Sequence, residues 1–207
     1  MNRHAAEITY IESHQRLIQA ATESFMEVGY RASIDRIAKR AGVARQTVYN
    51  HFPSKEYLFS EVVNIIVNNI LVSLDDGDGD IRQRLTRFAM VLRKRVMNDE
   101  GIAIFRTLVA EMPRFPALGQ VFFDKGPGQT VRRLADFIAR AMNDGTLRRD
   151  EPRFAAEMLL SMLEGFDRTR RLFGAPEFAG DHEQERVAVI VDCFLRAYAP
   201  GTVKGTP

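Results

Sequence analysis

The sequence predicts an all-α protein with a short N-terminal part and a longer C-terminal part. Hydrophobic side chains recur at helical spacing along most of the chain, whereas alternating strand patterns and Asn-Gly hairpin turns are nearly absent. Glycine and proline interrupt this pattern at intervals that suit helices of ordinary length. The chain has 207 residues, of which 45% are hydrophobic and 27% charged, so it is large enough for one globular domain or two smaller ones.

Three helices are predicted in the N-terminal part. The first carries an apolar stripe and ends at Gly29, because glycine readily adopts the left-handed conformation that closes a helix. Ser33 is placed to cap a second helix over residues 34–41, which Gly42 ends. A third helix covers residues 45–51 and is stopped by Pro53. The stripe of the first helix is expected to contain Ile18, Ala21, Phe25 and Val28.

The C-terminal part begins with a long helix over residues 54–74, capped by Ser54, and an acidic linker at 75–80. The alternating acids of the linker resemble a calcium loop. A calcium loop that starts at Asp76 would need glycine and glutamate where Ile81 and Arg87 stand, so no calcium site is expected. The later helices are expected at 81–98, 101–111, 116–142, 152–173 and 182–198. Gly126 and Gly128 should bend or split the helix at 116–142.

Several classes of protein are not expected. The chain lacks the spacing of zinc, P-loop and nucleophile-elbow motifs, so we expect no enzyme, no cofactor and no metal site. The most apolar stretch, residues 62–74, is interrupted by asparagines, and the first residues lack the apolar run of a secretory signal. These features favour a cytoplasmic protein that does not enter a membrane. Cys193 is expected to be a small buried side chain rather than a redox sensor.

Positive charge is concentrated in one short stretch. Residues 1–30 carry a net charge of −2 and residues 31–55 one of +5, although the whole chain carries only +2. Lysine and arginine displace counterions from phosphates, so such a local excess is typical of a nucleic-acid site.

The two short helices inside this stretch favour a helix-turn-helix. Ala38 is small enough for close packing of the second helix, and Gly42 tolerates positive φ in the turn. The second helix of such a unit enters the DNA major groove, where Arg45 would read guanine, Gln46 adenine, and Thr47 the thymine methyl. The residues expected to face inward are Ile34, Ile37, Val43 and Val48. The predicted contacts to double-stranded DNA are Ser33, Arg36, Arg45, Gln46, Thr47, Tyr49, Asn50, His51 and Lys55, with Tyr49, His51 and Lys55 holding phosphates.

Three runs, at residues 25–30, 33–43 and 47–59, together form one longer sequence signature. Its most specific part is Val48-Tyr49-x-His51-Phe52-x-x-Lys55. Over residues 14–62 the chain resembles the TetR/AcrR family of bacterial repressors. Position 50 is often tyrosine in that family and is asparagine here, which alters the expected operator. Residues 105–111 and 145–148 resemble one subgroup of the family's regulatory domains.

The resemblance implies a homodimer with a DNA-binding domain at residues 1–55 and a regulatory domain at 56–198, followed by a flexible tail at 199–207. In the family the last two long helices pair across a two-fold axis. The residues of that interface are expected to be Met158, Leu159, Val187, Ile190, Val191 and Phe194. The apolar stripes of these two helices would equally suit the core of a single chain.

The resemblance also implies a small-molecule effector that binds inside the regulatory domain. Its pocket is expected to be lined by Met90, Phe105, Leu108, Phe122, Phe123, Phe137, Met162 and Phe166. Such a lining favours an apolar or aromatic effector, although methionine and phenylalanine at helical spacing also form ordinary cores. The helix at 54–74 would transmit the signal. An activator, a DNA binder that needs no effector, and a helical scaffold for protein partners remain alternatives.

Overall fold

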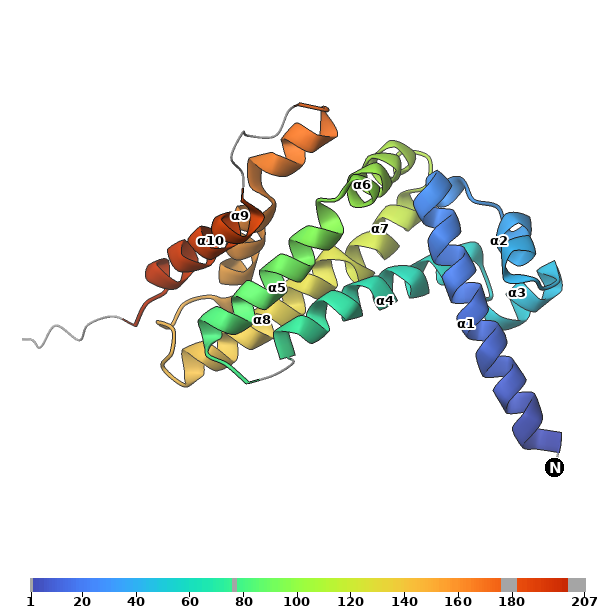
Figure 1. The fold of residues 1–207 in the computed structure, drawn as a ribbon, viewed down its shortest axis with the longest axis horizontal. Helices are drawn as coiled ribbons and strands as arrows, with labels where there is room; N and C mark the ends of the chain where they lie inside the picture. Colours follow the sequence, from blue (N-terminus) through green and yellow to red (C-terminus); the bar gives the residue numbers. More distant parts are fainter. Residues whose placement is uncertain (1, 76–77, 176–181, 201–207) are drawn as a thin grey trace, which may run out of the picture. The chain divides into compact units, whose positions relative to one another are not determined.

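The computed structural model describes residues 2–75, 78–175 and 182–200, and these are helical with no strand, which confirms the all-α prediction. The predicted tail at 199–207 lies mostly outside the described residues. The helices are α1 (Asn2–Val28), η1 (Gly29–Arg31), α2 (Ile34–Ala41), α3 (Arg45–His51), α4 (Lys55–Asp75), α5 (Ile81–Val96), α6 (Asp99–Glu111), α7 (Pro116–Lys125), α8 (Pro127–Asn143), α9 (Pro152–Leu172) and α10 (Glu183–Ala197) (Figure 1).

The chain forms two compact units. The first contains residues up to Ile66 together with Ala103–Gly126, and the second contains Val67–Ile102 together with residues from Pro127 onward. The predicted boundary at residue 55 separates the two parts by their order along the chain. By contacts, the first unit also holds residues 56–66 and 103–126.

Local signals position the helices of the first unit. The Ser33 hydroxyl accepts a hydrogen bond of 3.1 Å from the Arg36 amide, which confirms the predicted cap of α2. Gly42 has φ 67°, so it forms the left-handed turn between α2 and α3. Ala38, Ile37 and Val48 are buried between these helices.

The buried stripe of α1 differs from the predicted one. Leu17, Ala21 and Phe25 are buried, whereas Ile18 is half-buried and Val28 is exposed. Ala21 and Phe25 are thus buried as predicted, and the ends of the stripe differ because the helix turns its Leu17 side, rather than its Ile18 side, toward the core of the first unit.

Helices α5, α8, α9 and α10 form the second unit, in which α9 contacts α8, α5 and α10, and α10 contacts α5 (Figure 1). The glycines near 126 split the helix expected at 116–142 into α7 and α8, as predicted. Helix α5 ends at Val96, two residues early, because the Asn98 side chain accepts a hydrogen bond of 2.7 Å from the Gly101 amide at the start of α6. Cys193 is half-buried rather than buried.

Helix α4 is, among the described residues, the one helix long and apolar enough to cross a membrane by length and composition. Its most apolar window has a mean hydropathy of 1.5, and half of that window is buried inside the structure. The asparagines at 64, 68 and 69 therefore do not remove this property, contrary to the expectation from sequence. Burial of half the window is typical of a core helix.

Candidate nucleic-acid interface

Helix α3 presents a polar face to solvent. Val48 is fully buried and holds the helix in place, while Arg45, Gln46, Tyr49 and Asn50 are exposed. These four lie among the predicted DNA contacts, and the structure brings them together on one side of α3. Thr47, the predicted thymine contact, is half-buried.

The exposed side chains of α3 make contacts with neighbouring side chains. Arg45 Nη1 lies 3.1 Å from the Asp35 carboxylate on α2, and its guanidinium lies 5.7 Å from the centre of the Tyr49 ring. Gln46 Nε2 donates a hydrogen bond of 3.1 Å to Asn50 Oδ1, one turn later on the same helix. Because these contacts are solvent-exposed, they are weak enough to exchange for contacts with bases.

His51 is placed differently from the rest of the predicted contacts. Its ring is half-buried, stacks on Tyr10 with 4.2 Å between ring centres, and has Nε2 2.9 Å from the Ser13 hydroxyl. Burial, with a smaller effect of nearby His14, lowers the pKa of His51, so the neutral ring is favoured at pH 7. The structure thus gives His51 a role in joining α3 to α1.

Lys55 is also half-buried. Its ammonium lies 4.2 Å from the centre of the Tyr30 ring, whose hydroxyl donates a hydrogen bond of 2.7 Å to Glu56. Burial lowers the pKa of Lys55. A phosphate contact by Lys55 would therefore have to compete with its cation–π contact.

The arginines of α2 are paired with acids of α1. The Glu27 carboxylate accepts a hydrogen bond of 2.6 Å from Arg40 and a second one from Arg36. Glu23 lies 3.7 Å from Arg40, and these hydrogen bonds from Arg40 and Arg36 lower the pKa of Glu27. Sequence reasoning counted these arginines as available positive charge and missed the partners, because Glu27 is separated from both along the chain.

Of the two other basic side chains in residues 31–55, one is paired with an acid of the described residues and one is not. Arg31 pairs with the buried carboxylate of Glu111 at 2.5 Å. Lys39 is exposed on α2 and has no ion-pair partner within the described part of the chain. The exposed positive charge of the stretch is therefore smaller than the net charge of +5 computed from its sequence.

The predicted pocket residues do not gather in one described cavity. Phe105, Leu108, Phe122 and Phe123 belong to the first unit, and the other four to the second. Leu108 and Phe137 are buried, whereas Phe123 and Phe166 are exposed. Of the eight, only Met90 lines the larger described cavity, and Phe137 lines a smaller one.

The predicted dimer residues are also divided. Leu159, Val187, Val191 and Phe194 are buried in the core of their own chain, Ile190 is half-buried, and Met158 is exposed. The other large apolar side chains exposed on α9, α10 and the residue after α9 are Phe154, Phe166, Phe173 and Val189. Four of the six predicted residues therefore belong to the core of the chain itself, and the exposed apolar side chains lie beside them.

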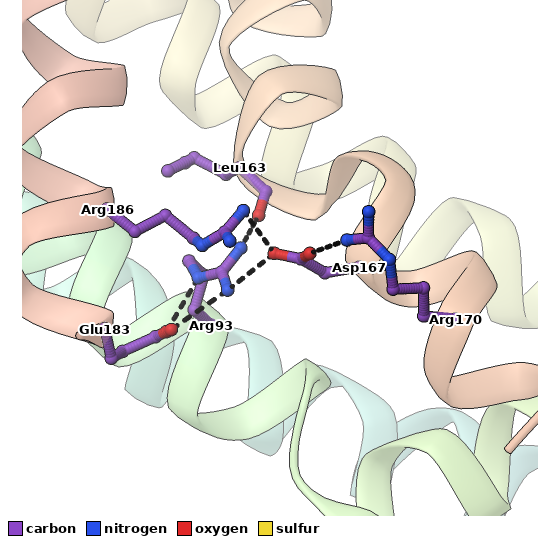
Figure 2. A network of polar contacts seen from close by, with 6 residues as sticks. All are labelled: Arg93, Leu163, Asp167, Arg170, Glu183 and Arg186. Atoms are coloured by element: carbon purple, nitrogen blue, oxygen red, sulfur yellow. Dashed lines mark hydrogen bonds and ion pairs between the residues drawn. The ribbon is translucent and has the colours of Figure 1, made fainter. Parts of the chain in front are cut away.

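Sequence reasoning missed a buried charge in the second unit. Arg93 on α5 is 4% exposed and reaches both α9 and α10 (Figure 2). Its Nε and Nη2 donate hydrogen bonds of 2.6 and 2.9 Å to the two oxygens of Glu183, and Nη2 also donates to Asp167 at 3.2 Å. Burial lowers the pKa of Arg93, but hydrogen bonds and charges of these two acids outweigh it, so the pKa is raised.

A kink in α9 completes this network. Gly165 has φ 44° and ψ −149°, which interrupts the helix expected to run unbroken over 152–173. A non-helical residue leaves carbonyls before it without their usual amide donors. The Leu163 carbonyl accepts a hydrogen bond from Arg93 instead, and Asp167 beyond the kink accepts from Arg170 at 3.0 Å and lies 2.9 Å from Arg186 (Figure 2).

Comparison with known protein families accounts for both parts of the chain. The family described as bacterial regulatory proteins of the tetR family matches residues 17–62, and the C-terminal domain of AefR-like transcriptional repressors matches residues 83–200. Together with the polar α3 face, these matches define a helix-turn-helix, DNA-binding transcriptional regulator. The chain belongs to the TetR family.

Individual relatives agree with this assignment. A putative TetR-family regulator from Mesorhizobium loti is 29% identical, with a TM-score of 0.73 and coverage of 92% of this chain and 98% of that one. The flavonoid-responsive regulator FrrA is 30% identical, with a TM-score of 0.69 and the same coverage. The activator FasR of Mycolicibacterium smegmatis is 36% identical over 88 residues, which are 41% of this chain and 40% of that protein. The chain thus spans about two fifths of FasR, and 36% of the Bacillus subtilis regulator YhgD.

Proposed function

We propose that the protein is a homodimeric repressor that binds a palindromic operator and is released by a small hydrophobic effector. The observation that carries this proposal is the exposed face of α3, where Arg45, Gln46, Tyr49 and Asn50 lie together on a helix held by buried Val48. Arginine and glutamine at the start of such a helix suit base edges in the major groove. Such a repressor would act in the cytoplasm.

The homodimer is supported by apolar side chains exposed on α9 and α10. Phe154 is 57% exposed and Val189 60% exposed, with Met158 one turn after Phe154. Exposed aromatic and methionine side chains are enriched in protein interfaces. A two-fold dimer would place two α3 helices about 34–36 Å apart, one turn of DNA.

Dimerisation is tested by sedimentation of Phe154→Glu and Val189→Glu variants. Both side chains are exposed, so a charge there should prevent association without unfolding the chain. Val72→Glu is the matched control, because Val72 is similarly exposed on α4. Variants that remain dimeric would show that the partner surface lies elsewhere.

The proposals for repression and for the chemical class of the effector are supported by similarity to known regulators. Similarity of residues 83–200 to AefR-like repressors supports repression, whereas the similarity to FasR supports the alternative of an activator. The similarity to a regulator named as flavonoid-responsive supports an aromatic effector.

The operator is tested by selection of random duplex DNA with the purified protein, followed by sequencing. An enriched inverted repeat is the expected result, and each half-site should lose its base preference at one position in the Gln46→Ala variant. If no sequence is enriched at low or moderate salt, the proposed operator recognition is wrong.

A further inference from the structure

Asp35 is the only acid in the basic stretch of residues 31–55, and it contacts the first residue of α3. Both of its carboxylate oxygens accept hydrogen bonds from Arg45 Nη1, at 3.1 and 3.3 Å. The side chains of Asp35 and Arg45 are 65% and 59% exposed, so the pair lies on the surface of the helix-turn-helix and is open to solvent. The one negative charge of the stretch is therefore held beside Arg45, the arginine proposed to contact a base.

Two ordinary roles of a surface acid do not account for this contact. An acid in the first turn of a helix interacts favourably with the helix dipole, and Asp35 lies in the first turn of α2, but that role needs no partner on α3. A solvent-exposed ion pair also contributes little to stability. Because a carboxylate next to DNA repels phosphates, Asp35 is expected to weaken DNA binding in general. Better discrimination between bases would offset this loss of affinity.

The geometry of the contact suits an arginine that reads a base. A guanidinium group carries N–H donors on three nitrogens, and bidentate recognition of guanine takes two N–H groups. Asp35 contacts Nη1 alone, so Arg45 can bind a base through Nε and Nη2 and keep its contact with Asp35. The Tyr49 ring, one turn later on α3, has its centre 5.7 Å from the guanidinium carbon of Arg45. Asp35 and Tyr49 together restrict a long side chain that would otherwise sample many rotamers.

We infer that Asp35 is a positioning residue for base recognition, which holds the Arg45 guanidinium so that its Nε–Nη2 edge meets guanine. The contact is weak in water, but DNA excludes water from the interface, and the attraction between the two charges then increases. Asp35 therefore raises selectivity for guanine while it lowers affinity for phosphates. The inference deepens the proposed operator recognition and rests on it.

The first experiment measures binding of the full-length protein to the selected operator, its single-base variants and a scrambled duplex by fluorescence anisotropy. Arg45→Ala identifies the guanine that Arg45 reads, as the position where base preference is lost. Asp35→Ala should lower the preference for guanine at that position by about three- to tenfold, out of the roughly 5- to 150-fold that a good bidentate contact provides. It should also raise affinity for the scrambled duplex by about two- to fivefold, because a negative charge next to the phosphates is removed.

The variant Asp35→Asn separates positioning from charge. Asparagine keeps an oxygen acceptor for Arg45 but carries no charge, so affinity for the scrambled duplex should rise as much as in Asp35→Ala, while more of the guanine preference is retained. In the Arg45→Ala background, Asp35→Ala should change base preference at no position. Glu12→Ala is the matched control, because Glu12 is an exposed acid on α1 with no ion pair inside the described ranges, and it should leave the guanine preference unchanged.

Three results would overturn the inference. Lost preference in Asp35→Ala at a base pair that Arg45→Ala leaves unchanged would show that Asp35 itself contacts DNA, as an acceptor for cytosine. Higher affinity for all duplexes with an unchanged guanine preference would show a purely electrostatic effect of Asp35. Base preference that survives in Arg45→Ala at every position would show that Arg45 does not read a base. Failure of the unchanged protein to select any operator is a separate result, which contradicts the proposed function and the inference with it.

Discussion

Glu27 is expected to limit the affinity of the protein for DNA phosphates. Its two carboxylate oxygens are occupied by Arg36 and Arg40, which lie one turn apart on the same side of α2. The carboxylate thereby compensates positive charge next to the candidate interface. In Glu27→Gln the shape is retained and the charge is removed, so Arg36 loses its acidic partner and Arg40 keeps only the longer contact of 3.7 Å with Glu23, which leaves both guanidinium groups more available to phosphates.

The size of this effect follows from counterion release. Each phosphate contact steepens the dependence of log affinity on log salt by about 0.9. If Arg36 and Arg40 each gain one contact, the slope of Glu27→Gln should be steeper by about 1.8 per subunit, and by about 0.9 if only one does. When the salt concentration is lowered tenfold, the affinity of both proteins for DNA rises. For each added contact, the rise in Glu27→Gln should be larger than in the unchanged protein by a factor of about eight.

Fluorescence anisotropy over a series of salt concentrations measures this slope, with the selected operator and a scrambled duplex. Because phosphates carry no sequence information, both duplexes should gain affinity and the ratio between them should fall. Glu12→Gln is the matched control, since Glu12 is an exposed acid on α1 without an ion pair among the described residues. An unchanged or shallower slope would refute the reasoning and indicate that Glu27 instead orients the arginines toward DNA.

Four further predictions follow from particular residues. Gln46→Ala should relax base preference at one position per half-site, by about 1–3 kcal/mol, as measured by competition with single-base operator variants. Gly29→Ala should lower the free energy of unfolding in urea by more than Gly42→Ala. Both glycines have positive φ, of 65° and 67°, but a Cβ at Gly29 would lie 2.2 Å from a side-chain methyl, whereas one at Gly42 meets nothing within 4 Å. Arg93→Met should destabilise the fold by about 2–4 kcal/mol in the same assay, because the half-exposed Glu183 loses its hydrogen bonds from Arg93 and the Leu163 carbonyl loses its donor, while Asp167 keeps Arg170 and Arg186. Stability should fall as pH is lowered from about 6.5 through the depressed pKa of His51, because the unfolded chain takes up the proton first, and His51→Gln should reduce this loss.

The helix-turn-helix could be predicted from the sequence because its determinants are local. A serine before the first turn of α2 and a glycine after its last turn set the ends of the helix, and Pro53 limits α3 to the residues predicted. The polar side chains of α3 could be assigned to its outer face once Val48 was assigned to the core. No distant contact is needed for any of these steps.

The charge partners could not be predicted in the same way. Glu27 meets Arg36, and Arg31 meets Glu111, only after the chain has folded, so a count of charges along the sequence overestimates the exposed positive charge. Burial of four predicted dimer residues has a similar cause, because an apolar stripe on a helix does not distinguish its own core from a partner.

Arg93 and Gly165 did leave signals in the sequence. Arg93 follows Leu85 and Ala89 at a spacing of four residues, so it continues a buried stripe of α5 and predicts a buried charge that needs acidic partners. Gly165 stands inside an otherwise regular helical pattern, where a glycine can mark a kink. Neither signal reveals that the two features meet, since the Leu163 carbonyl becomes a partner of Arg93 only when α9 packs against α5.

Contacts within the first unit provide a second route by which an effector signal is expected to reach the DNA-binding helices, besides the helix at 54–74. Residues 103–126 are distant in sequence from the DNA-binding helices but belong to the same compact unit. Thr107 lies so close to Gly29 that no side chain fits between them, and Glu111 holds Arg31 in the turn before α2. A packed and ion-paired contact of this kind cannot deform gradually, so a displacement of residues 103–111 must either break it or move the end of α1 as well. Any effector that shifts α6 is therefore expected to act on the DNA-binding helices through this contact, in addition to α4.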